Sequence, residues 1–103
     1  MIMEFVFNKE KAEDLGYTLE ACYEVIDRIF AEYGIEPEKQ GFYRGPNTQH
    51  TYDACTMSSN RLLASSWFLN VVEEWYWRVK SNDITSREDC LASYCRVKKM
   101  NLI

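Results

Sequence analysis

A stretch rich in hydrophobic residues, from Ser59 to Lys80, contains all three tryptophans and neither glycine nor proline. On a helix, with about 100° between successive residues, most of its apolar positions share one broad face. These positions are Leu63, Ala64, Trp67, Phe68, Val71, Val72, Trp75 and Val79. A second strip, formed by Leu62, Leu69 and Tyr76, lies beside them. The pattern predicts a central helix over 59–80 that other elements must cover on more than one side.

The first third of the chain predicts a strand followed by a helix. The β-branched and aromatic run Ile2–Phe7 is typical of a strand. A single helical turn is expected over 9–15. Apolar residues at three- and four-residue steps then predict a long helix over 18–33. Thr18 is the expected N-cap of this helix, and Gly34 is the expected left-handed residue after its end.

The remaining segments predict two more strands and a last helix. Strands are expected over 41–44 and 49–56, joined by a loop at Gly45-Pro46-Asn47. Thr85 and Glu88 are spaced as a capping box for a helix over 86–99. The fold class is therefore α+β, in the order β-α-β-β-α-α. A three-stranded antiparallel sheet with three helices packed on one face, forming a single domain over 1–103, is the economical arrangement.

Composition places the chain among small globular proteins. It has 103 residues, of which 47% are hydrophobic, and no apolar run approaches the roughly 20 residues of a membrane span. The first residues carry neither a basic leader nor a cleavage site, so we expect a cytoplasmic protein without a signal peptide. Four dispersed cysteines form no C-x-x-C pair and are expected to be reduced, mostly buried thiols. They are Cys22, Cys55, Cys90 and Cys95.

Charge is distributed unevenly along the chain. Residues 1–40 contain ten acids and four bases, whereas residues 41–103 contain six acids and eight bases. Glu20, Glu24 and Asp27 would share one face of the helix over 18–33, with Glu13 and Asp14 flanking it. This acidic face is either an ordinary solvated surface or a surface that binds a basic protein. Our leading hypothesis is the second: a non-enzymatic protein that occludes a basic, nucleic-acid-binding surface of a partner enzyme.

Trp77 lies away from the main apolar face of the predicted central helix. It is either covered by the last helix or exposed as a binding anchor. In the second case Leu69 and Tyr76 would share its exposure, and the three residues would form the interface of a homodimer. A structural or assembly role is therefore one alternative function.

A second alternative is weak binding of RNA or single-stranded DNA. Tyr43, Arg44, His50 and Tyr52 combine aromatic and basic side chains that could stack on bases. The acidic first half of the chain opposes this interpretation. No spacing of ligands indicates a metal site. His50 and Cys55 could act as base and nucleophile, but no third orienting group is evident and five residues along a strand place them on opposite faces, so we expect no cofactor and no catalytic activity.

The chain resembles one class of proteins in its general type. Its opening MEFVFNKEK, followed by Gly16-Tyr17-Thr18 before a helix, is similar to the start of small acidic accessory proteins of phages and mobile elements. Anti-CRISPR proteins belong to this class. The resemblance covers size, charge and architecture, and it implies inhibition by covering a nucleic-acid-binding surface. It assigns a role to no individual residue.

Overall fold

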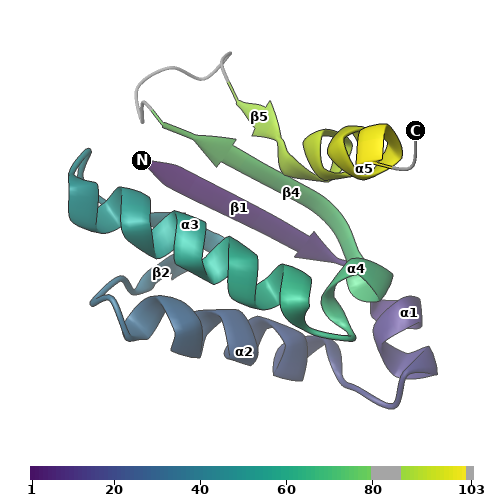
Figure 1. The fold of residues 1–103 in the computed structure, drawn as a ribbon. Coiled ribbons are helices and arrows are strands. Elements are labelled where there is room, and N and C mark those ends of the chain that lie inside the picture. Colours follow the sequence, from purple (N-terminus) through teal and green to yellow (C-terminus); the bar gives the residue numbers. More distant parts are fainter. Residues whose placement is uncertain (80–86, 102–103) are drawn as a thin grey trace.

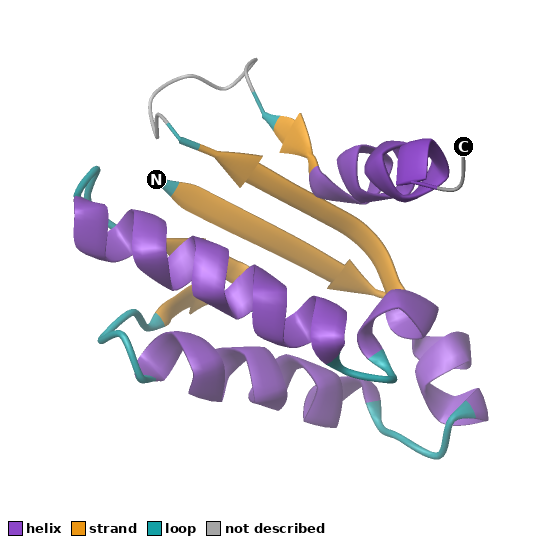
Figure 2. Ribbon diagram, viewed as in Figure 1, coloured by secondary structure: helices purple, strands orange, loops and turns teal. Residues whose placement is uncertain are grey.

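The computed structural model describes residues 1–79 and 87–101, with side chains for 1–79 and 87–95. Within these residues the chain forms a five-stranded antiparallel sheet in the order β2-β3-β1-β4-β5, with helices against one face (Figures 1 and 2). The elements are β1 (Ile2–Phe7), α1 (Lys9–Asp14), α2 (Leu19–Ala31), β2 (Pro37–Lys39), β3 (Phe42–Arg44), α3 (Gln49–Ala64), α4 (Phe68–Val71), β4 (Val72–Arg78), β5 (Glu88–Asp89) and α5 (Cys90–Asn101).

The predicted first strand is confirmed and lies at the centre of the sheet. β1 pairs with β3 on one side and with β4 on the other. Its alternation directs Met3, Phe5 and Phe7 toward the helices, where each is at most 4% exposed. Glu4 and Val6 point to the opposite face. Because hydrophobic residues of β1 contact both helices and neighbouring strands, this strand organises the core.

The predicted long helix is also confirmed, with its caps. In α2 the side chain of Thr18 accepts a hydrogen bond from the backbone N–H of Ala21, at 3.1 Å. Ile26 and Phe30, four residues apart, are fully buried. Gly34 has a φ of 75°, the left-handed conformation expected after the helix end. The short turn before it is confirmed as α1, which Asn8 caps.

The predicted central helix over 59–80 is wrong. Its first residues are the end of α3, 68–71 form the short helix α4, and 72–78 form strand β4. The segment alternates: Trp75 and Trp77 face the helices, whereas Tyr76 lies on the other face, opposite Glu4 of β1. Aromatic and β-branched residues fit both a helix and a strand, and pairing with β1 selects the strand. Trp75, in register with Phe5, stacks on its ring at 6.1 Å.

The strand expected over 49–56 is a helix instead. Thr48 caps α3 by accepting a hydrogen bond from the backbone N–H of Thr51, at 3.3 Å. The buried positions of α3 recur at helical spacing but are mostly small or polar, so they contribute little hydrophobic signal. They are Thr51, Ala54, Cys55, Ser58 and Leu62. The partner of β3 on its outer side is therefore β2, across a turn that contains Gly41.

The C-terminal helix begins later than expected. α5 starts at Cys90, and Glu88 belongs to β5, which pairs with β4, so the predicted capping box does not form around Glu88. Thr85 lies outside the described residues, as do the predicted helix break at 81–83 and the side chains at 96–99. Cys90 and Leu91 are partly buried and pack against the core.

The α+β class is confirmed, while the three-stranded, three-helix description is wrong in detail. The described residues form five strands and five helices. None of the described helices is long and apolar enough to cross a membrane.

Candidate functional site

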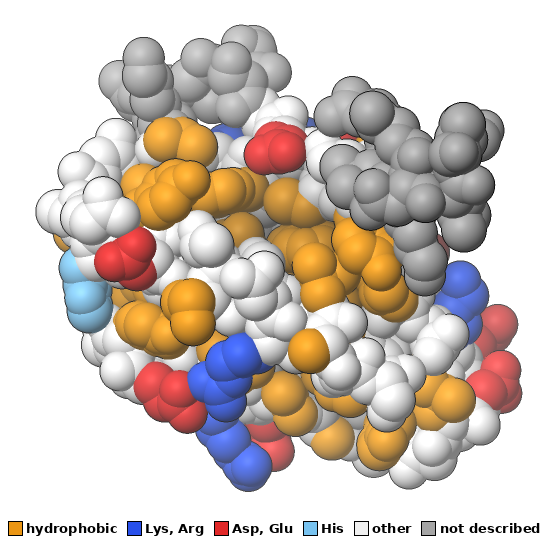
Figure 3. Space-filling view, viewed as in Figure 1, with side chains coloured by type: hydrophobic (Ala, Val, Ile, Leu, Met, Phe, Trp, Pro, Cys, Tyr) orange, Lys and Arg blue, Asp and Glu red, His pale blue; other side chains and the backbone are white. Residues whose placement is uncertain are grey.

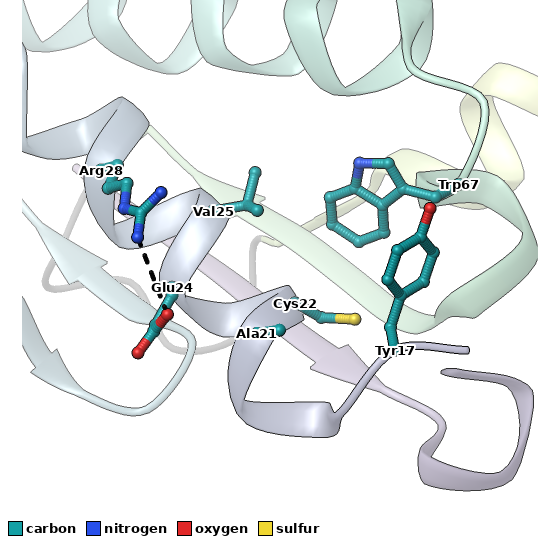
Figure 4. Close-up of a pocket in the computed structure, with 7 residues that line it drawn as sticks. All are labelled: Tyr17, Ala21, Cys22, Glu24, Val25, Arg28 and Trp67. Carbon is teal, nitrogen blue, oxygen red and sulfur yellow. Dashed lines mark ion pairs between the residues drawn. The ribbon is translucent and has the colours of Figure 1, made fainter. Parts of the chain in front are cut away.

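A cavity of about 430 Å³ opens along α2, the acidic helix. One wall is formed by the α2 residues Ala21, Val25 and Arg28, which recur at three- and four-residue steps (Figure 4). Across from them lie Trp67, just before α4, and Tyr17, in the loop between α1 and α2. The cavity therefore joins three segments that are far apart along the chain.

The two aromatic walls differ in how firmly they are held. The ring of Trp67 packs against the rings of Phe7, at 5.6 Å between centroids, and Phe68, at 5.9 Å. The side chain of Tyr17 is 45% exposed, and its backbone N–H donates to the carbonyl of Ala12 at 3.0 Å. One wall is thus fixed by the core, whereas the other has an anchored backbone and an accessible ring. The thiol of Cys22, whose pKa is raised by burial, contributes to the lining.

Charged side chains of α2 border the same cavity. The carboxylate of Glu24 lies 3.9 Å from the guanidinium of Arg28, and both side chains are mostly exposed. Exposed pairs of this kind contribute little to stability, so Glu24 can exchange its partner at small cost. Glu20 is exposed one helical turn earlier, on the same side as Glu24.

The predicted acidic face is only partly available for binding. Asp27 accepts a hydrogen bond from the hydroxyl of Tyr43, which is itself 2% exposed. Burial, together with this contact, raises the pKa of Tyr43, and the contact ties α2 to β3. Asp27 therefore contributes a contact within the fold, and its role in binding a partner stays a prediction. Glu13 and Asp14 are exposed on α1, where Glu13 lies 4.0 Å from Lys9.

The residues expected to bind nucleic acid are not brought together. Tyr43 faces the helices and stacks on Phe30, whereas Arg44 lies on the other face of the sheet and pairs with Glu38. His50 stands at the start of α3, with its Nε2 2.8 Å from the carbonyl oxygen of Tyr33. Tyr52 is on α3 rather than on a strand. The strand expected over 49–56 is part of α3, so the hairpin that would have carried these four side chains does not form.

The proposed dimer interface is likewise divided. Trp77 faces the helices, where its ring lies 5.4 Å from that of Tyr52. Tyr76, the next residue along β4, lies on the opposite face of the sheet, with the guanidinium of Arg87 at 3.7 Å. Leu69 is exposed on α4. The three side chains therefore form no common surface.

The cysteine thiols differ in exposure and in ionisation. Cys22 and Cys55 are at most 3% exposed, and burial raises the pKa of Cys55 to about 11. Cys90 is half-buried, and burial together with Glu88 and Asp89 raises its pKa to about 12. Cys95 is exposed, so the expectation that most of the thiols are buried holds for two of the four.

We expect the aromatic disulfide reagent DTNB to modify Cys95 first. The thiolate is the reacting species, and a raised pKa leaves little thiolate at about pH 8, so Cys90 should react slowly and faster as pH rises. Cys55 should react only in denaturant, because the core excludes the reagent, and Cys22, which lines the cavity but is 3% exposed, should react slowly. Mass spectrometry of the partly modified chain checks this order, and Cys95→Ser should remove the fast phase. A fast reaction at Cys55 in the native chain would contradict its burial in the core.

Trp67 and Tyr17 were not identified as site residues from the sequence. The sequence pattern places Trp67 on the apolar face of a helix, and the adjacent Ser65 and Ser66 are the signal that this helix ends before it. Among the described residues, no histidine, cysteine and carboxylate side chains gather in a group that could hold a metal ion. No protein-family model matches the chain, and no curated protein matches it in sequence.

Proposed function

We propose that this chain is a non-enzymatic protein-binding domain that docks α2 and the cavity beside it on a basic segment of a partner protein. The observation that carries the proposal is the combination of an apolar cavity with acidic side chains along one helix. The cavity lies between Val25 and Trp67, and Glu24 is on its border. Binding sites commonly pair an aromatic or aliphatic pocket with charged groups at the rim.

Charge favours a basic partner. Residues 9–32, which span α1 and α2, contain seven acids and three bases. Arg28 and Lys9 are the bases that lie within ion-pair distance of acids on their own helices, and both pairs are exposed and close to 4 Å long. Such pairs are screened by salt and easily replaced by a partner's lysine or arginine. Complementary charge of this kind steers encounter and selects partners.

The partner segment we propose is amphipathic: an apolar side chain enters the cavity and neighbouring lysines or arginines meet Glu20 and Glu24. If those cations normally bind nucleic-acid phosphates, docking would prevent nucleic acid from binding. This is the mode of inhibition that the resemblance to anti-CRISPR proteins implies. The specific function that we propose is therefore inhibition of a partner by covering its nucleic-acid-binding surface.

We expect the double substitution Glu20→Lys and Glu24→Lys to weaken partner capture roughly tenfold. Tyr17→Ala should have an effect of similar size, because it removes an accessible wall of the cavity. The measurement is affinity capture by the tagged chain from cells of its native background, at low and high salt, with captured proteins quantified. A captured basic protein should then lose its bound nucleic acid when purified native chain is added.

The control is a reversal of equal charge away from the cavity, Asp53→Lys with Glu73→Lys, two exposed positions on α3 and β4. It changes the net charge by the same amount and should leave capture intact. Capture that survives the α2 reversal, or that falls equally with the control, would refute docking through α2. Circular dichroism of each variant verifies that the fold is retained.

A further inference from the structure

A second cavity, distinct from the one at Trp67, runs between α3 and α5. It is an open groove of about 350 Å³ on the helix-facing side of β4. Its apolar and aromatic lining comprises Tyr52, Leu63, Trp75, Trp77, Cys90 and Tyr94. Figure 3 shows hydrophobic side chains gathered along this space between the helices. Its size and lining are typical of sites that bind small molecules.

Two hydrogen-bond donors in this lining have no acceptor. In the described part of the chain, five buried side-chain nitrogen or oxygen atoms lack a hydrogen-bond partner, and two of them are the indole Nε1 atoms of Trp75 and Trp77. Trp75 is 3% exposed. Buried indole N–H groups usually have an acceptor, because an unpaired buried donor costs free energy. As residues two apart on a strand, the two tryptophans lie about 7 Å apart along the same face.

The polar groups around the cavity indicate a neutral occupant. Thr56, Asn60 and Ser93 contribute uncharged hydroxyl and amide groups to the lining. Glu88 is the charged side chain among the described lining residues, and its carboxylate already accepts a hydrogen bond from the hydroxyl of Ser93, at 3.1 Å. Among these described residues an anionic ligand would lose its hydration without gaining a counter-charge, and a cation would have to compete with Ser93 for a single carboxylate.

We propose that the cavity between α3 and α5 binds a flat, neutral, apolar small molecule whose carbonyl oxygen accepts a hydrogen bond from the indole of Trp77. The indole nitrogen of Trp77 is covered, and the ring of Tyr52, 5.4 Å away between centroids and 44% exposed, is the neighbouring wall that moves to admit the ligand. Rotamer changes of exposed side chains are fast.

The test compares two probes of the same shape, 2-acetylnaphthalene and 2-ethylnaphthalene, of which the first alone carries a carbonyl. Each is titrated into the isotope-labelled chain while the indole N–H resonances are followed by NMR. We expect the resonance of Trp77 to shift and that of Trp67, in the other cavity, to remain in place. The ketone should bind roughly five- to tenfold more tightly, the contribution of one hydrogen bond.

Trp77→Phe keeps an aromatic ring and removes the donor, so it should abolish the preference for the ketone. Trp67→Phe is the matched control and should leave the preference unchanged. Equal affinity for the two probes, a shift at Trp67 instead of Trp77, or no shift up to the solubility limit of the ketone would each overturn the proposal. If Trp77→Phe is too unstable to assay, the comparison of the two probes on the native chain still decides.

Discussion

Phe5→Ala is expected to lower the free energy of unfolding by about 3–5 kcal/mol. Phe5 is 2% exposed in the central strand, and its ring lies within 6.5 Å, between centroids, of five other aromatic rings. They belong to Phe7, Phe30, Tyr43, Phe68 and Trp75. Removing this ring leaves a cavity that the sheet and the helices cannot fill by moving closer. The protein therefore loses the free energy of burying the ring and also bears the cost of the empty cavity. Guanidinium denaturation followed by circular dichroism measures the change.

The neighbouring residue provides the control for this prediction. Val6 belongs to the same strand but points to the other face of the sheet and is 38% exposed. Val6→Ala should cost only about 0.5–1 kcal/mol, from lower strand propensity and a small loss of burial. Similar losses at the two positions would mean that the helix-covered face is not the principal core.

Gly41→Ala is expected to lower the free energy of unfolding by about 3 kcal/mol or more. Gly41 has a φ of 73°, which alone costs a residue with a Cβ about 1–2 kcal/mol. In addition, a Cβ there would overlap the carbonyl oxygen of Phe5 and lie 2.9 Å from the ring of Tyr23. The backbone cannot move away freely, because the N–H of Phe5 donates to the carbonyl of Gly41 at 2.8 Å.

Gly34 separates the two causes of that loss. Its φ of 75° is nearly the same, but nothing lies within 4 Å of a Cβ built on it. Gly34→Ala should therefore show the conformational cost alone, about 1–2 kcal/mol. Thermal or chemical denaturation of both variants under identical conditions gives the difference. Equal losses would show that β1 does not approach the turn at Gly41 closely.

The sequence predicted the acidic side chains of the candidate site but not its apolar cavity. Glu20 and Glu24 are identified by their helical spacing, and the structure leaves both exposed. The participation of Asp27 in the fold could not be predicted, since its partner, Tyr43, is sixteen residues away and was expected on a separate hairpin. The apolar half of the site depends on Trp67, whose position follows from the end of α3 and the start of β4.

The sequence by itself determined β1, α2 with its caps at Thr18 and Gly34, and the acidic character of the first 40 residues. These features depend on neighbours along the chain: a cap bonds within three residues, and hydrophobic spacing is read within one element. Tertiary structure alone decided that 49–64 is a helix and 72–78 a strand. The first buries small and polar residues that carry almost no hydrophobic signal, and the second contains aromatic residues compatible with either state. In both, contacts distant in sequence, above all the pairing of β4 with β1, selected the conformation. They thereby created the cavity beside α2 and the cavity between α3 and α5.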